Sequence, residues 1–410
     1  MKKILEFLLL FLLIGCSINK KEPVNNETYH SKDMKAIEDK VEKIMDDMTI
    51  EEKIGQMIFA FYNKDVVDDE LKDIIINTKI GGFVLFAKNF STYEKTLSFI
   101  KEVKKYNSIP LFISIDQEGG KIQRLNELRD VSVSDIPYMY DLGSMNDKEL
   151  SYNVGKVIAE ELRVFCINMD FAPVLDIYSN SLNTVIGKRA FGSDYKTVTD
   201  NALSLAKGLE DNGIIPVYKH FPGHGDTIID SHEDLPIITK SREELLNFEL
   251  IPFKRAIESG ANIIMVGHLA VPSITKDNIP ASLSKKLISD FLKDELGYRG
   301  LVITDALNMK ALTNYYSEDE LCPIAVKAGV DLLLMPPSPK VCLTSVINEI
   351  QKGNISIDRI NESVRKILKL KYLKIDENYN NYLPKEFLNS NSHKKILNGV
   401  KQWKKKKIIY

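Results

Sequence analysis

The residues best suited to acid–base chemistry gather in one segment, residues 217–236, which reads VYKHFPGHGDTIIDSHEDLP. Three of the six histidines of the chain and three aspartates fall within it. An apolar run comes just before, so these titratable side chains follow the expected end of a buried strand. Proton transfer needs such groups side by side at a defined place. The segment is therefore the first candidate for a catalytic site, although polar loops also contain histidine, aspartate and glycine.

Eight short apolar runs recur along the body of the chain and alternate with segments of helical periodicity. The runs cover residues 55–61, 80–86, 110–116, 169–176, 214–220, 261–268, 300–305 and 330–335. Continuous apolar character suits parallel strands that are buried on both faces. Eight successive β–α units predict an α/β fold, a (β/α)8 TIM barrel with a single catalytic domain and an enlarged connection at 117–168. A doubly wound open sheet is the alternative.

Ionisable side chains end five of these runs at their carboxyl ends. They are Asp116, Asp176, His220, His268 and Asp305. Barrel enzymes place their catalytic residues at this face, so we expect the five to meet at one mouth. Carboxylates on a concave surface suit glycoside chemistry, in which one group attacks the anomeric carbon and another protonates the leaving oxygen. The sequence contains no motif of serine hydrolases, P-loop NTPases or dinucleotide-binding enzymes.

Five motifs resemble the β-N-acetylglucosaminidases of glycoside hydrolase family 3. The segment KHFPGHGDT…DSH…LP at 219–236 resembles the signature of that family. Four further stretches agree with it: IDQEGGKIQRL (115–125), DFAPVLDI (170–177), IGKRAFG (186–192) and LVITDALNMKAL (301–312). The resemblance runs from about residue 40 to about residue 372, and it too implies a (β/α)8 barrel.

The resemblance implies a role for each matching residue. Asp305 matches the nucleophile that forms a covalent glycosyl-enzyme intermediate, and His232 matches the general acid/base, with Asp230 as its partner. In the family, the loop that carries this pair is mobile and brings it over the bound sugar. The residues that match sugar contacts are Asp116, Arg124, Arg189, Lys219 and His220. The residues expected to shape loops rather than act on substrate are His224, Asp226, Asp176 and His268.

The resemblance also implies an activity. It is the removal of terminal, non-reducing β-linked N-acetylglucosamine, with retention of configuration, from cell-wall-derived muropeptides or similar glycans. No metal and no organic cofactor is implied. A family 3 β-glucosidase or a phosphorylase of N-acetylglucosaminides on the same barrel is the alternative. An inactive, lipid-anchored sugar-binding protein is an alternative of another class, but binding alone needs neither Asp305 nor the Asp230–His232 pair.

The amino terminus predicts export and lipid attachment. Two lysines precede an apolar run from Phe7 to Ile14, which is too short to span a bilayer. The run leads into Leu-Ile-Gly-Cys, which resembles a bacterial lipobox, so Cys16 is the predicted lipidated first residue of the mature chain. We expect a lipoprotein signal peptide at 1–16, a flexible tether at 17–35, and a location in the cell envelope outside the cytoplasm.

The rest of the chain predicts one catalytic domain at 36–375 and a lysine- and asparagine-rich tail at 376–410. The hypothesis for the tail is a remnant of a second domain. The net charge of −2 gives no argument for nucleic-acid binding, and we expect a monomer. The remaining cysteines are Cys166, Cys322 and Cys342. Their apolar neighbours and odd number favour buried free thiols over disulfides.

Overall fold

The computed structural model describes residues 26–227, 231, 233–375 and 382–408. The chain divides into two compact units, before and after the boundary between Lys40 and Val41. Helix α1 (Asn26–Asp47) begins inside the predicted tether. The second unit contains the fold described below. Cys16 and the predicted signal peptide lie outside the described residues.

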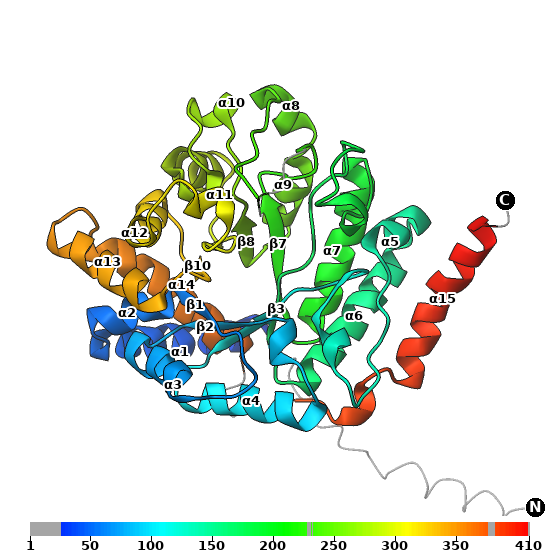
Figure 1. Cartoon of the computed structure of the whole chain (residues 1–410), viewed down its shortest axis with the longest axis horizontal. Coiled ribbons are helices and arrows are strands. Elements are labelled where there is room, and N and C mark those ends of the chain that lie inside the picture. Colours follow the sequence, from blue (N-terminus) through cyan, green and yellow to red (C-terminus); the bar gives the residue numbers. More distant parts are fainter. Residues whose placement is uncertain (1–25, 228–230, 232, 376–381, 409–410) are drawn as a thin grey trace, which may run out of the picture. The chain divides into compact units, whose positions relative to one another are not determined.

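Eight parallel strands form the centre of the second unit (Figure 1). The strands are β1 (Ile58–Phe61), β2 (Gly82–Leu85), β3 (Phe112–Ile115), β6 (Met169–Asp170), β7 (Ile215–Phe221), β8 (Ile263–Val266), β9 (Leu301–Thr304) and β10 (Leu333–Leu334). They pair in the order β10-β1-β2-β3-β6-β7-β8-β9, and a parallel bridge between Ile303 and Leu332 links β9 to the segment of β10. Each strand overlaps one of the eight apolar runs, and the predicted (β/α)8 barrel is confirmed.

Helices lie between successive strands and surround them (Figure 1). Those that precede β7 are α2 (Ile50–Gln56), α3 (Asp69–Thr78), α4 (Tyr93–Lys105), α5 (Met139–Met145), α6 (Lys148–Val164) and α7 (Tyr195–Asp211). Those that follow β7 are α8 (Arg242–Asn247), α9 (Ile251–Glu258), α10 (Pro272–Thr275), a π-helix (Lys286–Glu295), α11 (Lys310–Thr313), α12 (Glu318–Ala328), α13 (Pro339–Gln351), α14 (Ile357–Lys374) and α15 (Asn391–Ile408). The side chains of Thr92 and Asp194 cap α4 and α7 by accepting a backbone N–H of the first turn.

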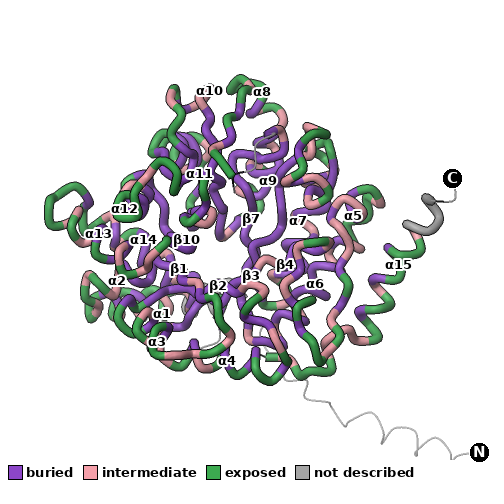
Figure 2. Tube along the Cα trace, in the orientation of Figure 1, coloured by how far each residue is buried: buried purple, intermediate pink, exposed green. Residues whose placement is uncertain are grey.

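The strands are buried and the outer helix faces are exposed (Figure 2). All seven residues of β7 are buried, although its sequence, IPVYKHF, includes Lys219 and His220. A charged or polar group taken out of water is costly unless it finds partners inside the protein. These two side chains therefore need polar partners within the protein.

The enlarged connection between β3 and β6 contains a two-stranded hairpin and two helices. The hairpin is β4 (Gln117–Gly119) with β5 (Ile122–Gln123), and it follows β3 after a single residue, Asp116. Gly119 and Gly120, at its turn, have φ angles of 100° and 56°, a conformation that favours glycine. The hairpin carries Glu118 back over the end of the barrel.

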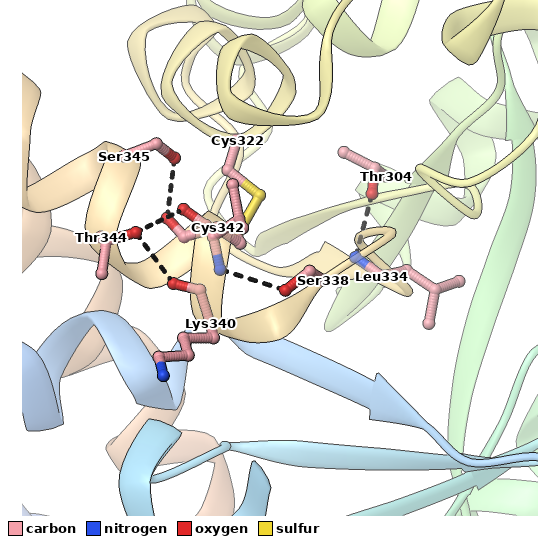
Figure 3. Close-up of a disulfide and its surroundings, with 9 residues drawn as sticks. Thr304, Cys322, Leu334, Ser338, Lys340, Cys342, Thr344 and Ser345 are labelled. Carbon is pink, nitrogen blue, oxygen red and sulfur yellow. Dashed lines mark hydrogen bonds between the residues drawn. A yellow bond between two sulfur atoms is a disulfide. The ribbon is translucent and has the colours of Figure 1, made fainter.

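Cys322 and Cys342 form a disulfide, with their Cα atoms 5.4 Å apart (Figure 3). The prediction of free thiols is wrong for these two residues. Helix α12 precedes β10 in the sequence and α13 follows it, and the two helices pack against each other. Their packing brings together two cysteines that are 20 positions apart. An odd number of cysteines leaves one unpaired but does not prevent the others from pairing. Cys166 is free, as expected, and it is only partly buried.

The predicted tail contains helix α15, which packs beside α5 and α6 (Figure 1). Its His393 is fully buried, and the imidazole Nε2 lies 2.7 Å from Glu160 Oε2 of α6. Leu397 and Val400 follow on the same buried face. Among the described residues, no helix is long and apolar enough to cross a membrane.

Candidate active site

A pocket of about 330 Å³ lies at the carboxyl ends of the barrel strands. Its polar lining residues are Asp116, Glu118, Arg124, Arg189, Lys219, His220, His224, Ser231, Asp305 and Asn308. Every predicted catalytic or substrate-binding residue within the described ranges therefore lines this one pocket. The volume is at the lower end of the range of ligand sites, so the pocket suits one sugar ring rather than a long glycan.

Asp305 follows β9 and ends in the pocket. Its Oδ1 accepts a hydrogen bond from the backbone N–H of Ala306 at 2.8 Å. Burial acts to raise the pKa of Asp305, but His268, His220, the Ala306 N–H and Lys219 outweigh burial and hold it below the ordinary value. The side chain is therefore an ionised carboxylate that is poorly solvated, as a carboxylate nucleophile requires.

Lys219 and two carboxylates form the polar centre of the pocket. The Nζ atom of Lys219 lies 2.6 Å from Asp116 Oδ1 and 2.6 Å from Glu118 Oε1. Lys219 is 2% exposed, so this ammonium depends on the two acids for its stability. Burial acts to lower the pKa of Lys219, but Asp116 and Glu118 together raise it. The lysine is therefore a fixed cation.

Glu118 also pairs with Arg189. The sequence analysis did not identify Glu118 as a site residue. Its Oε2 accepts from Arg189 Nε at 2.7 Å, and its Oε1 accepts from Arg189 Nη2 at 2.7 Å. This two-pronged geometry fixes the guanidinium plane. Arg189 and Lys219 lower the pKa of Glu118 in spite of its burial. One carboxylate thus orients two of the predicted sugar-binding cations.

Arg124 lies on the other side of Asp116. Its Nη2 is 3.8 Å from Asp116 Oδ2, and its guanidinium stacks over the Phe86 ring with a separation of 5.2 Å. The buried Nε of Arg124 has no hydrogen-bond partner among the described residues. A buried donor without an acceptor is costly, so a ligand hydroxyl or carbonyl here would satisfy it.

His220 is oriented by a buried aspartate. Its Nδ1 lies 2.6 Å from Asp176 Oδ2, and Asp176 Oδ1 accepts from the backbone N–H of His224 at 2.6 Å. Asp176 is fully buried, in contact with protein rather than with the pocket. With its Nδ1 held by Asp176, His220 has only Nε2 left for a ligand. Asp176 has the loop-shaping role expected from the sequence.

His268 supports the backbone beside Asp305. It is fully buried, with Nε2 2.9 Å from the carbonyl oxygen of Ala306 and Nδ1 2.7 Å from Ser282 Oγ. Since a carbonyl only accepts, Nε2 carries the proton and donates it. The geometry matches the expected structural role, and it fixes the residue that follows the predicted nucleophile.

Asp230 and His232 lie outside the described residues, but Ser231 between them is described. Ser231 is buried and lines the pocket, and its Oγ lies 3.2 Å from His224 Nε2. Its carbonyl accepts from the backbone N–H of Ala311 in α11 at 3.3 Å. Asp226, before this segment, lies 3.5 Å from Lys240, after it. The centre of the Asp-Ser-His motif is therefore tied to the chain just beyond Asp305.

A parallel barrel with a half-buried, ionised carboxylate beside fixed cations at its mouth is the arrangement expected of sugar-processing barrel enzymes. The chain belongs to glycosyl hydrolase family 3, whose N-terminal domain matches residues 49–370. The family predicted from the sequence is thereby confirmed.

Relatives with curated names support this assignment. The chain is 34% identical to a β-hexosaminidase of Nitrosomonas eutropha over 276 residues, which cover 65% of this chain and 77% of the relative. It is 31% identical to β-hexosaminidase A of Pseudoalteromonas piscicida over 330 residues, 74% of this chain but 55% of the relative. A solved family 3 β-N-acetylglucosaminidase from Paenibacillus sp. str. FPU-7 superposes with a TM-score of 0.77 and 36% identity, over 80% of this chain and 63% of that one. The chain thus spans little more than half the length of some relatives.

Proposed function

We propose that this protein is a retaining exo-β-N-acetylhexosaminidase that removes terminal β-linked N-acetylglucosamine from wall-derived muropeptides or similar glycans. The observation that carries the proposal is Asp305, an ionised carboxylate that lines a pocket of about 330 Å³. The names of the β-hexosaminidase relatives support the substrate class. A carboxylate in this position attacks the anomeric carbon and forms a covalent glycosyl ester.

The polar groups around Asp305 bind the sugar in this proposal. Asp116 accepts hydrogen bonds from sugar hydroxyls, while Lys219, Arg124 and Arg189 donate. Because the cations are already paired with carboxylates, they enter the reaction in a fixed position and need little reorganisation. The terminal sugar is thereby aligned with the carboxylate of Asp305 before bond breaking begins.

Asp230 and His232 supply the proton transfer in this proposal. Asp230 holds one imidazole nitrogen, and the other nitrogen protonates the glycosidic oxygen and later removes a proton from water. The buried, pocket-lining position of Ser231, which stands between them in the sequence, supports this assignment.

The variant His232→Ala tests this assignment through the leaving group. A general acid contributes roughly 10²–10⁴-fold when the leaving oxygen is basic, and little when the leaving group departs unassisted. We expect turnover of chitobiose to fall by that factor, while 2,4-dinitrophenyl N-acetyl-β-glucosaminide is cleaved at nearly the wild-type rate of glycosylation. Pre-steady-state burst measurements on both substrates provide the comparison. Equal losses on both substrates contradict the acid/base role.

Product analysis separates the remaining candidates. Release of N-acetylglucosamine in water, with initial retention seen by NMR, supports a hydrolase, whereas release of the 1-phosphate only in phosphate buffer identifies a phosphorylase. Cleavage of the glucoside in preference to the N-acetylglucosaminide identifies a β-glucosidase. Binding of N-acetylglucosamine without any turnover identifies a sugar-binding protein.

We also propose that the protein is anchored through a lipid on Cys16 and works outside the cytoplasm. The charged start, the short apolar run and the lipobox-like end support the proposal. The Cys322–Cys342 disulfide gives separate support, because structural disulfides form mainly in oxidising compartments.

The variant Cys16→Ser is expected to move the protein from the membrane fraction to the soluble fraction and to abolish incorporation of labelled palmitate. The variant Cys166→Ser is the control and is expected to stay in the membrane fraction with its label. Recovery of the wild-type protein, unlabelled, from the cytoplasmic fraction would falsify the anchor.

A further inference from the structure

A buried carboxyl group near the barrel mouth has a single hydrogen-bond partner among the described residues. Asp170, the last residue of β6, is fully buried. Its Oδ1 accepts a hydrogen bond from the backbone N–H of Gln117 at 2.9 Å. Its Oδ2 has no hydrogen-bond partner among the described residues. Asp170 does not line the pocket, so it has no direct contact with a bound sugar.

The hydrogen bond between Asp170 and the Gln117 N–H lies next to two residues that bind Lys219. Gln117 lies between Asp116 and Glu118, the two acids that hold the Lys219 ammonium. The peptide N–H held by Asp170 therefore sets the path of the backbone at the start of the β4–β5 hairpin. A shift of this peptide would change how both carboxylates meet Lys219.

Two residues before Asp170, the neutral side chain of Asn168 also accepts a hydrogen bond from a backbone N–H. Asn168 Oδ1 accepts from the backbone N–H of Ile113 on β3 at 2.9 Å, and its Nδ2 donates to the Leu111 carbonyl at 3.0 Å. The segment of β6 thus holds the backbone within β3 and just beyond it through two side-chain oxygens. An amide is sufficient for this contact, and no negative charge is needed.

The surroundings of Asp170 favour its protonated form. The charged groups that face it are Asp116 from the end of β3, Glu118 from the hairpin and Lys219 from β7. Burial, the largest influence, raises the pKa of Asp170 to about 8, and Asp116 and Glu118 add to the rise. The Gln117 N–H and Lys219 oppose it. At neutral pH a third negative charge beside the two acids is therefore avoided.

We propose that Asp170 is a positioning residue that works as a neutral carboxylic acid, holding the Gln117 backbone so that Asp116 and Glu118 both meet the Lys219 ammonium. Once ionised, Asp170 attracts Lys219 and repels Asp116 and Glu118. These forces weaken the contacts that hold the sugar-binding groups in place. The role rests on the proposed function, since the ligand that reports it is N-acetylglucosamine.

The experiment compares Asp170→Asn with Asp170→Ala. We measure binding of N-acetylglucosamine by calorimetry between about pH 6 and about pH 9.5, a range that spans the titration of Asp170. The wild-type affinity is expected to fall about tenfold across this range as Asp170 ionises. Asp170→Asn keeps the bond to Gln117 and stays neutral, so its affinity is expected to match the wild type at neutral pH and to remain flat. Asp170→Ala is expected to bind at least about tenfold more weakly at neutral pH.

Two results overturn the proposal: an alkaline loss in Asp170→Asn equal to that of the wild type, or equally weak binding by Asp170→Asn and Asp170→Ala at neutral pH. A wild-type protein whose affinity does not change with pH also overturns it.

A second measurement separates this proposal from the proposed function. If the wild type neither cleaves nor binds N-acetylglucosaminides, the proposed function fails, but unfolding in urea still tests Asp170. Between pH 3.8, the ordinary pKa of an aspartate, and about pH 8, Asp170 is protonated in the folded protein and ionised in the unfolded chain. The wild type is therefore expected to lose stability relative to Asp170→Asn as pH rises through this window. Parallel pH profiles overturn the assignment of the proton.

Discussion

Asp305→Ala is expected to lower kcat/KM for N-acetyl-β-glucosaminides by a factor on the order of 10⁵, while the fold and sugar binding persist. The factor corresponds to about 7 kcal/mol of transition-state stabilisation, which only a group in contact with the reacting carbon supplies. Within the part of the chain that the structure describes, the variant loses one hydrogen bond of the carboxylate, which it accepts from the Ala306 N–H. Steady-state kinetics and calorimetric binding of N-acetylglucosamine are the measurements.

Azide provides the diagnostic control for this variant. In the space left by the carboxylate, azide attacks the anomeric carbon from the same side and forms a glycosyl azide of inverted configuration. We expect this product only from Asp305→Ala and from no other variant. Turnover by Asp305→Ala close to that of the wild type, without azide, contradicts the nucleophile assignment.

Glu118→Gln is expected to have the next largest effect, on binding and on stability together. The change puts a neutral amide in place of the carboxylate that Arg189 and Lys219 share. Lys219 keeps Asp116 as its partner, whereas the Arg189 guanidinium loses the carboxylate that holds it. Breaking a buried ion pair costs about 3 kcal/mol or more of the free energy of unfolding when a charge is left without compensation. Since both cations are expected to contact the sugar, KM is expected to rise by roughly 10²-fold and kcat/KM to fall at least as much. Urea unfolding and kinetics on one preparation measure both effects.

Glu161→Gln is the matched control for this prediction. Glu161 is 1% exposed and accepts from the backbone N–H groups of Ser134 and Asn389, away from the pocket. Its loss is expected to lower the free energy of unfolding and to leave KM unchanged. If both glutamine variants change stability alone, Glu118 is a purely structural residue.

The barrel could be predicted from the sequence because its signal is local and repeated. Each strand is a short apolar run, and a residue that ends such a run lies at the mouth of the barrel, as Asp116, His220 and Asp305 do. The sequence could also separate Asp176 and His268 from the residues that line the pocket, but it grouped His224 with them, and His224 lines it. The carboxyl ends of the strands can therefore be predicted from the sequence.

Glu118 could not be assigned in this way, because its position depends on a turn. It lies three residues beyond β3, and only the β4–β5 hairpin returns it to Lys219. The stretch IDQEGG contains the signal in retrospect, since two glycines after an acid indicate a tight turn. In the sequence, Asp170 is indistinguishable from any residue that ends a strand. Its unpartnered oxygen and the charges around it are known only from the three-dimensional structure.

The disulfide has a practical consequence for the study of this enzyme. Cys322 and Cys342 flank β10, the strand next to both β1 and the β9 segment, so the bond spans the place where the barrel closes on itself. Closing a loop of this length in the unfolded chain is worth about 3 kcal/mol. Protein made in a reducing cytoplasm lacks that contribution, and its melting temperature and half-life describe a less stable molecule than the disulfide-bonded one. Comparison with relatives should therefore begin with titration of the thiols in each preparation.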